Sequence, residues 1–423
     1  MKKIAMFMSA LALAFTFASC EKGDKDSVDL DNVTEDGFYV SGPATGAEAL
    51  STDYMMAAGL NEAADLENGE NPNRSGMFEK YVALEAGKEF YLVLYTNGVE
   101  TKYGANLETF DVAEKQENPR DVEVKRGLLV EGADAPSMTV AENGLYHIIL
   151  DLNEGGDLAF GKQIVVAPVN WGERGITDSA NWSWNAMTPG AFNQKTMTWT
   201  ATNLMMKADG YFKFAYSGAW KLDLDDAGKV KANTNLGIEA ADKGELGDNA
   251  LVPNGKDIKL SRGYYTVTLT WTLKGGAIKN GYSATIVKTG EVAAPDYSNC
   301  QVELVGDGVV AQDGAVDDES GWNWGNVYRA ANDGKPVKNG DVYTWTWSNV
   351  QLSDAGWKVR SLNGSESGGQ NLNLGAEVID FENSAEVAGT TGDIKLKAAG
   401  TYNVTLVVDA NANTTKLTIV SAN

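Results

Sequence analysis

Alternating apolar and polar positions recur at three places along the chain. Each stretch begins with Gly, carries Tyr two residues later and then alternates: GLYHIILDL (144–152), GYYTVTLTW (263–271) and GTYNVTLVV (400–408). A second strand-like run follows each of them (KQIVVAPV, YSATIVK and KLTIVS), and an aromatic run precedes it (EFYLVLY, GYFKFAY and GWKVRSL). A period of two predicts β-strands with one buried face. The chain therefore contains three copies of one β-rich unit.

The alternation also assigns a face to each residue of the closing strands. The predicted inward residues are Tyr146, Ile148, Leu150 and Leu152, then Tyr265, Val267, Leu269 and Trp271, then Tyr402, Val404, Leu406 and Val408. His147, the only histidine, falls on the outward face, where the other copies carry Thr266 and Asn403. We therefore expect His147 to be a surface residue without a catalytic role.

The copies are spaced by about 120–140 residues, which is the length of a domain and too long for a solenoid unit. Short strands broken by Gly, Asn and Asp, without a βαβ pattern, predict an all-β fold of tandem antiparallel β-sandwiches. We expect units at 34–164, 165–291 and 299–423, with a linker at 290–299 and direct packing between the first two. Only 48–66 suggests a helix.

The N-terminus predicts export and lipidation. Lys2 and Lys3 precede an apolar run of about 15 residues, which ends at Ala18-Ser19-Cys20. Such a run is too short for a membrane span, and small residues before a cysteine are typical of a bacterial lipoprotein signal. We expect a signal peptide at 1–19, lipidation of Cys20 and a flexible tether at 20–33; an ordinary secretory signal is the alternative. The acidic residues after Cys20 resemble a Bacteroidetes surface-export signal, although a solvated linker would look the same.

The net charge limits the class of partner, and the number of cysteines limits how the domains can be stabilised. The net charge is −23, and removing residues 1–19 with their two lysines makes it −25. This large negative net charge argues against nucleic acid or anionic lipid as a partner and favours neutral ligands. Cys300 is the only cysteine besides Cys20, so the domains must be stable without an internal disulfide.

The tryptophans provide the candidate chemistry. All eleven lie at or beyond Trp171, and the second and third units each carry a W-x-W pair flanked by polar, loop-forming residues: Trp182 and Trp184, then Trp322 and Trp324. Indole faces stack on the apolar face of a sugar ring, while nearby polar side chains bind its hydroxyls. Lys213 and Lys358 occupy equivalent outward positions, and Trp220 offers a second aromatic face. Alternatively, the pairs fill the cores, as we expect for Trp199, Trp271, Trp345 and Trp357.

Metal and catalytic motifs are weak. DLDDAG (223–228) resembles the start of a calcium loop but has Ala227 at its fifth position, and DGAVDDES (313–320) is ambiguous. The sequence has no GxSxG, HExxH or Cys/His cluster. We expect no enzyme activity, metal or cofactor, although paired carboxylates of a glycosidase need no fixed spacing.

Together, the lipoprotein signal, the tandem β units, the W-x-W pairs and the GYFKFAY and GWKVRS strands resemble the SusE/SusF family of Bacteroidetes outer-membrane lipoproteins. The resemblance implies surface-displayed sandwiches, immunoglobulin-like or like carbohydrate-binding modules. It implies that they bind starch-like glycans beside a TonB-dependent transporter and its SusD-like partner. It also implies sites that pair stacking aromatics with Lys or Arg, and a first domain that serves as a spacer.

The site residues that the resemblance implies are Trp182, Trp184, Lys213 and Trp220 in the second unit and Trp322, Trp324 and Lys358 in the third. The third unit departs from the pattern, because SLNGSESGGQ (361–370) contains no counterpart of Trp220. The alternatives are a protein-interaction lipoprotein whose tryptophans are core and a glycoside hydrolase accessory protein.

Overall fold

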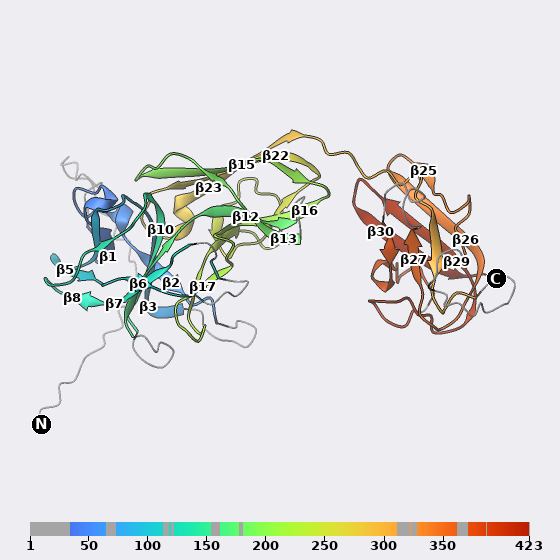
Figure 1. Cartoon of the computed structure of the whole chain (residues 1–423), viewed down its shortest axis with the longest axis horizontal. Coiled ribbons are helices and arrows are strands. Elements are labelled where there is room, and N and C mark those ends of the chain that lie inside the picture. Colours follow the sequence, from blue (N-terminus) through green and yellow to red (C-terminus); the bar gives the residue numbers. More distant parts are fainter. Residues whose placement is uncertain are drawn as a thin grey trace, which may run out of the picture.

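The computed structural model describes residues 34–64, 73–112, 118–119, 122–153, 161–176, 181–310, 322, 328–361, 371–385 and 387–422. These residues form three antiparallel β-sandwiches in chain order (Figure 1), which confirms the predicted all-β tandem fold. In the ranges described, no helix has the length and apolar character needed to cross a membrane. Cys20, Trp324 and the 313–320 segment lie outside the described residues.

The first sandwich pairs two sheets. In order, one sheet contains β1 (Gly37–Ser41), β4 (Glu89–Thr96), β5 (Val99–Gly104) and β8 (Val130–Glu131), with β9 (Met138–Thr139) also on β4. The other contains β2 (Ala57–Leu60), β3 (Asn73–Leu84), β10 (Gly144–Asp151), β11 (Gln163–Pro168), β7 (Lys125–Leu128) and β6 (Glu108–Thr109). Because β11 pairs with β10, this sandwich continues to Pro168, beyond the expected end at 164.

The helix expected at 48–66 is absent from the part of that segment that is described. The segment contains a short 3₁₀ turn, η3 (Thr52–Tyr54), and strand β2; a second 3₁₀ turn, η2 (Pro43–Thr45), precedes it. Tyr54 and Met56, two residues apart, are both buried, and this spacing is that of an extended chain. Pairing with β3 decides the conformation, because tertiary contacts override the helix propensity of Ala and Met.

The second sandwich has the same two-sheet plan. One sheet contains β13 (Asn181–Ala186), β12 (Trp171–Ile176), β16 (Gly210–Tyr216), β19 (Asn235–Ile238) and β20 (Leu251–Pro253), with β21 (Ile258–Leu260) also on β16. The other contains β14 (Thr188–Pro189), β15 (Thr196–Met206), β22 (Gly263–Thr272) and β23 (Tyr282–Gly290). A separate hairpin is formed by β17 (Lys221–Asp223) and β18 (Lys231–Asn233), and η4 (Ile278–Gly281) connects β22 to β23.

The third sandwich repeats this arrangement with fewer described strands. One sheet contains β24 (Val302–Val305), β27 (Lys358–Ser361) and β28 (Asn373–Leu374), followed by η6 (Ala376–Val378). The other contains β25 (Val337–Asn339), β26 (Val342–Leu352), β29 (Gly400–Asp409) and β30 (Thr414–Ser421). The second and third sandwiches even share a β-bulge, where Asn203 of β15 and Asn349 of β26 take positive φ values of 56° and 55°. Asn tolerates this left-handed conformation better than most residues do.

The repeated Gly-x-Tyr pattern has a structural cause. The hydroxyl groups of Tyr146, Tyr265 and Tyr402 each donate a hydrogen bond to the carbonyl oxygen four residues upstream, over 2.7, 2.9 and 2.8 Å. This is the tyrosine corner known from immunoglobulin-like sandwiches, in which the Tyr fixes the turn that enters a closing strand. The three copies therefore share the device that starts their closing strand.

The predicted inward faces of the closing strands are confirmed. Every predicted inward residue is buried except Leu152, which is half-buried. Trp199, Trp271, Trp345 and Trp357 also lie in the cores, each at most 2% exposed. These four tryptophans fill the space between the sheets and belong to the fold.

The first two sandwiches share a hydrophobic core. One continuous cluster contains buried residues of both, whereas the third sandwich has a cluster of its own. A second shared cluster forms where Leu222, Leu224 and Val230 of the β17–β18 hairpin cover Ile149 and Val165 of the first sandwich. Figure 1 shows β17 beside β2, β3 and β6, whereas the third sandwich stands apart.

The prediction that His147 lies at the surface is wrong. Its side chain is 0% exposed; Nε2 lies 2.9 Å from Oε2 of Glu79, and Nδ1 lies 3.2 Å from the hydroxyl of Tyr216. Its ring stacks on Tyr81 at 4.2 Å, next to Trp171. Alternation correctly put His147 on the outer face of its sheet, but the second sandwich covers that face. The histidine is a hydrogen-bonded part of the interface between the two sandwiches.

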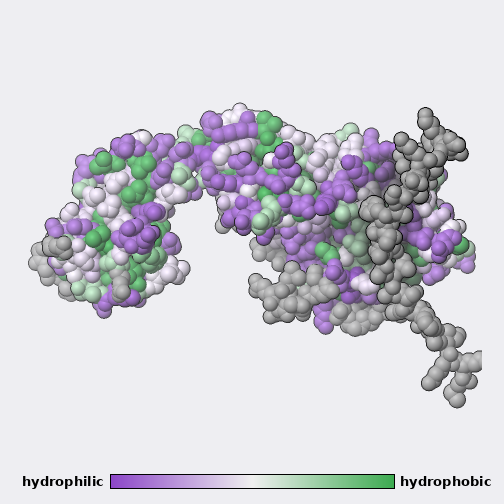
Figure 2. All heavy atoms as spheres, turned by 180° about the vertical axis from the view of Figure 1, so that it is seen from behind, coloured by the Kyte–Doolittle hydropathy of each residue, from purple (hydrophilic) through white to green (hydrophobic). Residues whose placement is uncertain are grey.

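The third sandwich is joined to the second by the 290–299 segment and by Arg262. Arg262 Nη2 donates to the carbonyl oxygens of Ala410, in a short contact, and of Asn411, at 3.4 Å, while Nε donates to the carbonyl of Lys207 at 2.8 Å. This junction is polar, unlike the apolar one between the first two sandwiches. Hydrophilic residues cover much of the face in Figure 2, consistent with the net charge of −23.

A buried lysine at the first interface predicts a pH dependence of stability. Lys80 is 5% exposed, its ammonium donates to the carbonyl of Lys274, and burial lowers its pKa from 10.5 to about 8. Between pH 8 and 10 the unfolded Lys80 therefore binds more protons than the folded Lys80, so this side chain should add about 2 kcal/mol to the free energy of unfolding. The buried tyrosines Tyr81, Tyr216 and Tyr282, whose pKa values burial raises, contribute in the opposite direction toward pH 10. Urea unfolding at pH 7.5, 8.5 and 9.5 measures this change.

Lys80→Met is the matched comparison for that experiment. It should stabilise the first two sandwiches at pH 7.5 and remove much of the rise. Burial also lowers the pKa of Lys213, and the smaller contribution of Lys213 to the pH dependence of stability is present in both proteins. An equal rise with pH in the wild type and the variant would contradict the assignment to Lys80.

Candidate functional site

Two of the candidate side chains, Trp184 and Lys213, lie in one row across the second sandwich, with Arg174 between them. In the registers of β12 with β13 and β16, Arg174 lies opposite Trp184 on one side and opposite Lys213 on the other. Directly opposed residues on neighbouring strands share a face of the sheet. The row therefore places an indole, a guanidinium and an ammonium group on the outer face.

Trp220 adds a second aromatic ring to this row. It follows β16, and its ring centroid lies 4.3 Å from Cζ of Arg174 and 5.9 Å from Nζ of Lys213. Its carbonyl oxygen accepts a hydrogen bond from Nδ2 of Asn235 at 2.9 Å, which fixes the loop. Trp220 is half-buried and is held by cation–π contacts.

Trp184 lies close to the backbone of the sheet because Gly172 makes room for it. Its Nε1 donates to the carbonyl of Ala215 at 3.0 Å, and its side chain remains half-buried. A Cβ at Gly172 would lie 2.2 Å from that Nε1, and one at Gly218 would lie 3.6 Å from the indole ring. Trp182 is on the same strand, β13. The structure therefore places this W-x-W pair on an edge strand, whereas the polar flanks of the pair suggested a position in or beside loops.

Lys213 is positioned by a carboxylate. Its Nζ lies 3.7 Å from Oδ1 of Asp257, and its side chain is only 15% exposed. Burial lowers the pKa of Lys213, and Asp257 partly opposes that shift. Lysine and aspartate side chains together offer donors and acceptors to a hydroxylated ligand.

Sequence reasoning missed Arg174 and Asp257. Arg174 is 5% exposed and donates from Nη1 to the carbonyl of Gly218 at 2.8 Å, so it supports the loop that carries Trp220. Its role follows from the strand register, which the sequence did not show. Asp257 could have been found, because it begins a D-I-K-L motif (257–260) that recurs at 393–396.

The third sandwich repeats part of the site. Lys358 Nζ lies 3.6 Å from Oδ1 of Asp393, which matches the pair formed by Lys213 and Asp257. Trp322 is half-buried, and its carbonyl oxygen accepts from Nη2 of Arg360 at 2.9 Å. The structure thus places Trp322 next to the strand of Lys358.

The first sandwich has a different set at the equivalent place. Tyr91 occupies the position of Lys213, and Nζ of Lys102 lies 5.0 Å from its ring centroid. The same Nζ donates to Oγ of Ser137 at 3.1 Å. The sequence has no tryptophan before Trp171, so this surface lacks the indole platform.

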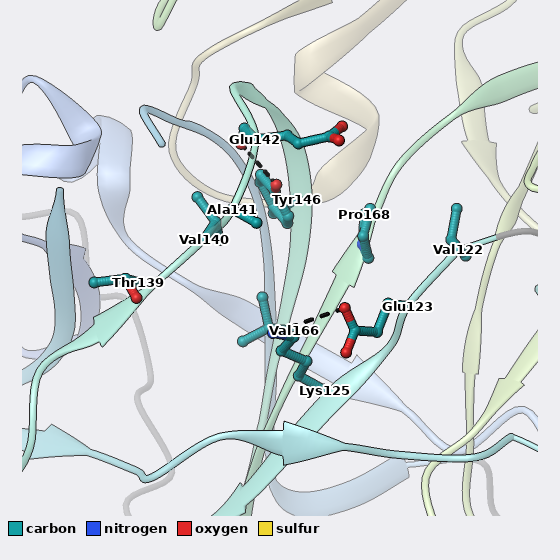
Figure 3. A pocket seen from close by; sticks show the side chains of 10 residues that line it. All are labelled: Val122, Glu123, Lys125, Thr139, Val140, Ala141, Glu142, Tyr146, Val166 and Pro168. Atoms are coloured by element: carbon teal, nitrogen blue, oxygen red, sulfur yellow. Dashed lines mark hydrogen bonds and ion pairs between the residues drawn. The ribbon is translucent and has the colours of Figure 1, made fainter. Parts of the chain in front are cut away.

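A cavity of about 260 Å³ lies in the first sandwich, away from these residues. Figure 3 shows its ten lining side chains, among them Tyr146, Val166 and the Glu123–Lys125 ion pair at 3.8 Å. Tyr146 is its only aromatic lining residue, and the hydroxyl of Tyr146 is bonded to Glu142. None of the predicted site residues lines this cavity.

The loop that resembled a calcium site is part of the interface hairpin. Oδ1 of Asp225 accepts from the backbone N–H of Lys229 at 2.8 Å, which closes the turn between β17 and β18. Nδ2 of Asn118 donates to Oδ2 of Asp223 at 2.9 Å across the interface. Within the described ranges, no group of three or more His, Cys, Asp or Glu side chains is arranged to hold a metal ion.

The fold and the site define a tandem β-sandwich protein with aromatic and charged side chains grouped on the outer face of a sheet. No protein-family model matches the sequence, and a search of curated proteins found no match. Among solved structures, the chain is similar to the crystal structure of SusF from Bacteroides thetaiotaomicron. The alignment has 14% sequence identity and a TM-score of 0.20, and it covers 93% of this chain and 73% of that chain.

Proposed function

We propose that this chain is a non-catalytic lipoprotein that binds polysaccharide at the cell surface. The cluster on the second sandwich carries the proposal, because Trp184 and Trp220 lie beside Arg174, Lys213 and Asp257 on the outer face of one sheet. Half-buried indoles provide stacking surfaces for sugar rings, and the charged groups bind hydroxyls. Core packing accounts for Trp199, Trp271, Trp345 and Trp357 but not for these two partly exposed rings.

The ligand class follows from the charge balance. The chain has a net charge of −23, and Lys213 and Lys358 are each paired with an aspartate. An anionic ligand would meet both the overall repulsion and these carboxylates. A neutral polysaccharide fits best, and the resemblance to SusE/SusF proteins favours a starch-like glycan.

The proposal includes a second site and a location. Trp322, Trp324 and Lys358 form the site on the third sandwich, while the first sandwich is the spacer and Trp182 belongs to the site on the second. Lipidation of Cys20 anchors the chain at the outer membrane, facing the medium. There it captures glycan for a TonB-dependent transporter and a SusD-like partner.

Affinity electrophoresis tests binding directly. Gels containing amylopectin, or one of several other neutral polysaccharides, should retard the wild-type protein, and Trp184→Ala should migrate faster. Losing one stacked indole removes about 1.5–3 kcal/mol of apolar burial, which corresponds to a roughly 10- to 100-fold weaker affinity of the second site. Calorimetry with an oligosaccharide measures that affinity.

Tyr264→Ala is the matched control, because Tyr264 is an exposed aromatic residue on β22, in the opposite sheet. It should leave migration unchanged. Absence of retardation on every glycan would refute the proposal and favour a protein-interaction role. Release of reducing sugar by the pure protein would favour a glycoside hydrolase.

A further inference from the structure

A segment of the first sandwich reaches the site on the second. After β2, the backbone N–H of Glu62 donates to the carbonyl of Lys231 at 2.9 Å, and Oδ1 of Asn61 accepts from the N–H of Lys231 at 3.0 Å. Nδ2 of Asn61 donates to the carbonyl of Lys229 at 3.1 Å. These bonds hold the segment against the β17–β18 hairpin, which begins directly after Trp220.

Glu62 lies among the polar residues that surround Trp220. Nζ of Lys221 donates to its carbonyl oxygen at 2.6 Å, and Nδ2 of Asn254 donates to its Oε2 at 3.3 Å. Asn254 also donates from its backbone N–H to the carbonyl of Asn235, the residue whose side chain holds the Trp220 loop. The carboxylate of Glu62 is thus linked through Asn254 and Asn235 to the backbone carbonyl of Trp220, and the backbone carbonyl of Glu62 is bonded to Lys221, the residue after Trp220.

The charges at this place are coupled. Burial raises the pKa of Glu62, and the ammonium groups of Lys221 and Lys213 oppose that rise. In turn, Glu62 and Asp257 oppose the lowering of the Lys213 pKa. Lys213 therefore experiences the negative charge of carboxylates from two different sandwiches.

We propose that Glu62 is a ligand-binding residue of the second sandwich's site and accepts hydrogen bonds from hydroxyls of a neutral glycan stacked on Trp220. The inference rests on the proposed function and extends the site across the interface between the first two sandwiches. A carboxylate accepts from two adjacent hydroxyls at once, while Lys213 donates. The first sandwich then supplies one wall of the site in addition to spacing it from the membrane.

Calorimetry on the full chain tests this role, with maltoheptaose as the first probe and cellohexaose and laminarihexaose as further neutral probes. Glu62→Ala should weaken binding at the second sandwich about 5- to 30-fold, and Glu62→Gln, which keeps one acceptor, should weaken it less. The unfolding temperature should not change. Glu89→Ala, an exposed glutamate on β4 in the other sheet of the first sandwich, should bind like the wild type.

Two comparisons separate the possible failures. If Trp220→Ala weakens binding and Glu62→Ala does not, the role of Glu62 is overturned and the proposed function stands. If the wild type binds none of the probes or polysaccharides, both fail. Asn61→Ala, which releases the segment, should weaken binding without adding to the effect of Glu62→Ala; full additivity would overturn the proposal.

Discussion

Trp171→Ala should destabilise the first two sandwiches by about 3–5 kcal/mol, the usual cost of removing a buried Trp. Trp171 is 0% exposed, and its ring lies 5.4 Å from that of Tyr282, 5.8 Å from that of Tyr216 and 6.2 Å from that of Tyr81. Tyr81 belongs to the first sandwich and the others to the second, so the cavity would open within their shared core. Calorimetry should show that one transition falls by roughly 6–20 °C.

Trp345→Ala is the matched control. Trp345 is equally buried but belongs to the separate core of the third sandwich. Trp345→Ala should lower the unfolding temperature of the third sandwich and leave that of the first two sandwiches unchanged. A single transition that shifts with both variants would show that all three sandwiches unfold together, contrary to the two separate cores.

The double variant Trp220→Ala/Trp322→Ala should have the largest effect on polysaccharide binding. The proposed sites lie on two sandwiches connected by the 290–299 segment, so one long glycan can occupy both. Linking two weak sites raises apparent affinity by about 10²–10⁴-fold, and each single variant should lose that gain. The double variant should show no retardation in the gel.

Stoichiometry distinguishes two sites from one. A short oligosaccharide should bind the wild type at two sites per chain and each single variant at one. If Trp322→Ala left both the stoichiometry and the retardation unchanged, the third sandwich would have no binding role. Phe381→Ala removes an exposed aromatic residue of the third sandwich and should behave like the wild type.

The sequence predicted the closing strands and their cores well, because alternation reports directly which side chains share a face. It did not report what covers that face. His147 and Ile149 look like outward residues in the sequence, and they are, but the β17–β18 hairpin and the second sandwich bury them. Such contacts join residues about 70 or more positions apart, which local periodicity does not record.

The candidate site was predictable where the copies repeat each other. Lys213 and Lys358 were found because GYFKFAY and GWKVRS align, and each lysine does pair with an aspartate. Arg174 and Glu62 have no such repeat. Arg174 reaches Lys213 through strand register, and Glu62 reaches the site from another sandwich, so both required the structure.

The outer face of β10, which the second sandwich and the β17–β18 hairpin bury, also limits how the order of the sandwiches can change in evolution. A free-standing copy needs a polar outer face, as β22 has with Thr266, Thr268 and Thr270, whereas β10 presents His147 and Ile149 there. The first copy has therefore become dependent on its neighbour, and the order of the first two can no longer be exchanged. Recombination that exchanges binding domains between such proteins should therefore occur within 290–299. A break near residue 170 would separate the first two sandwiches and expose the apolar faces that they bury against each other.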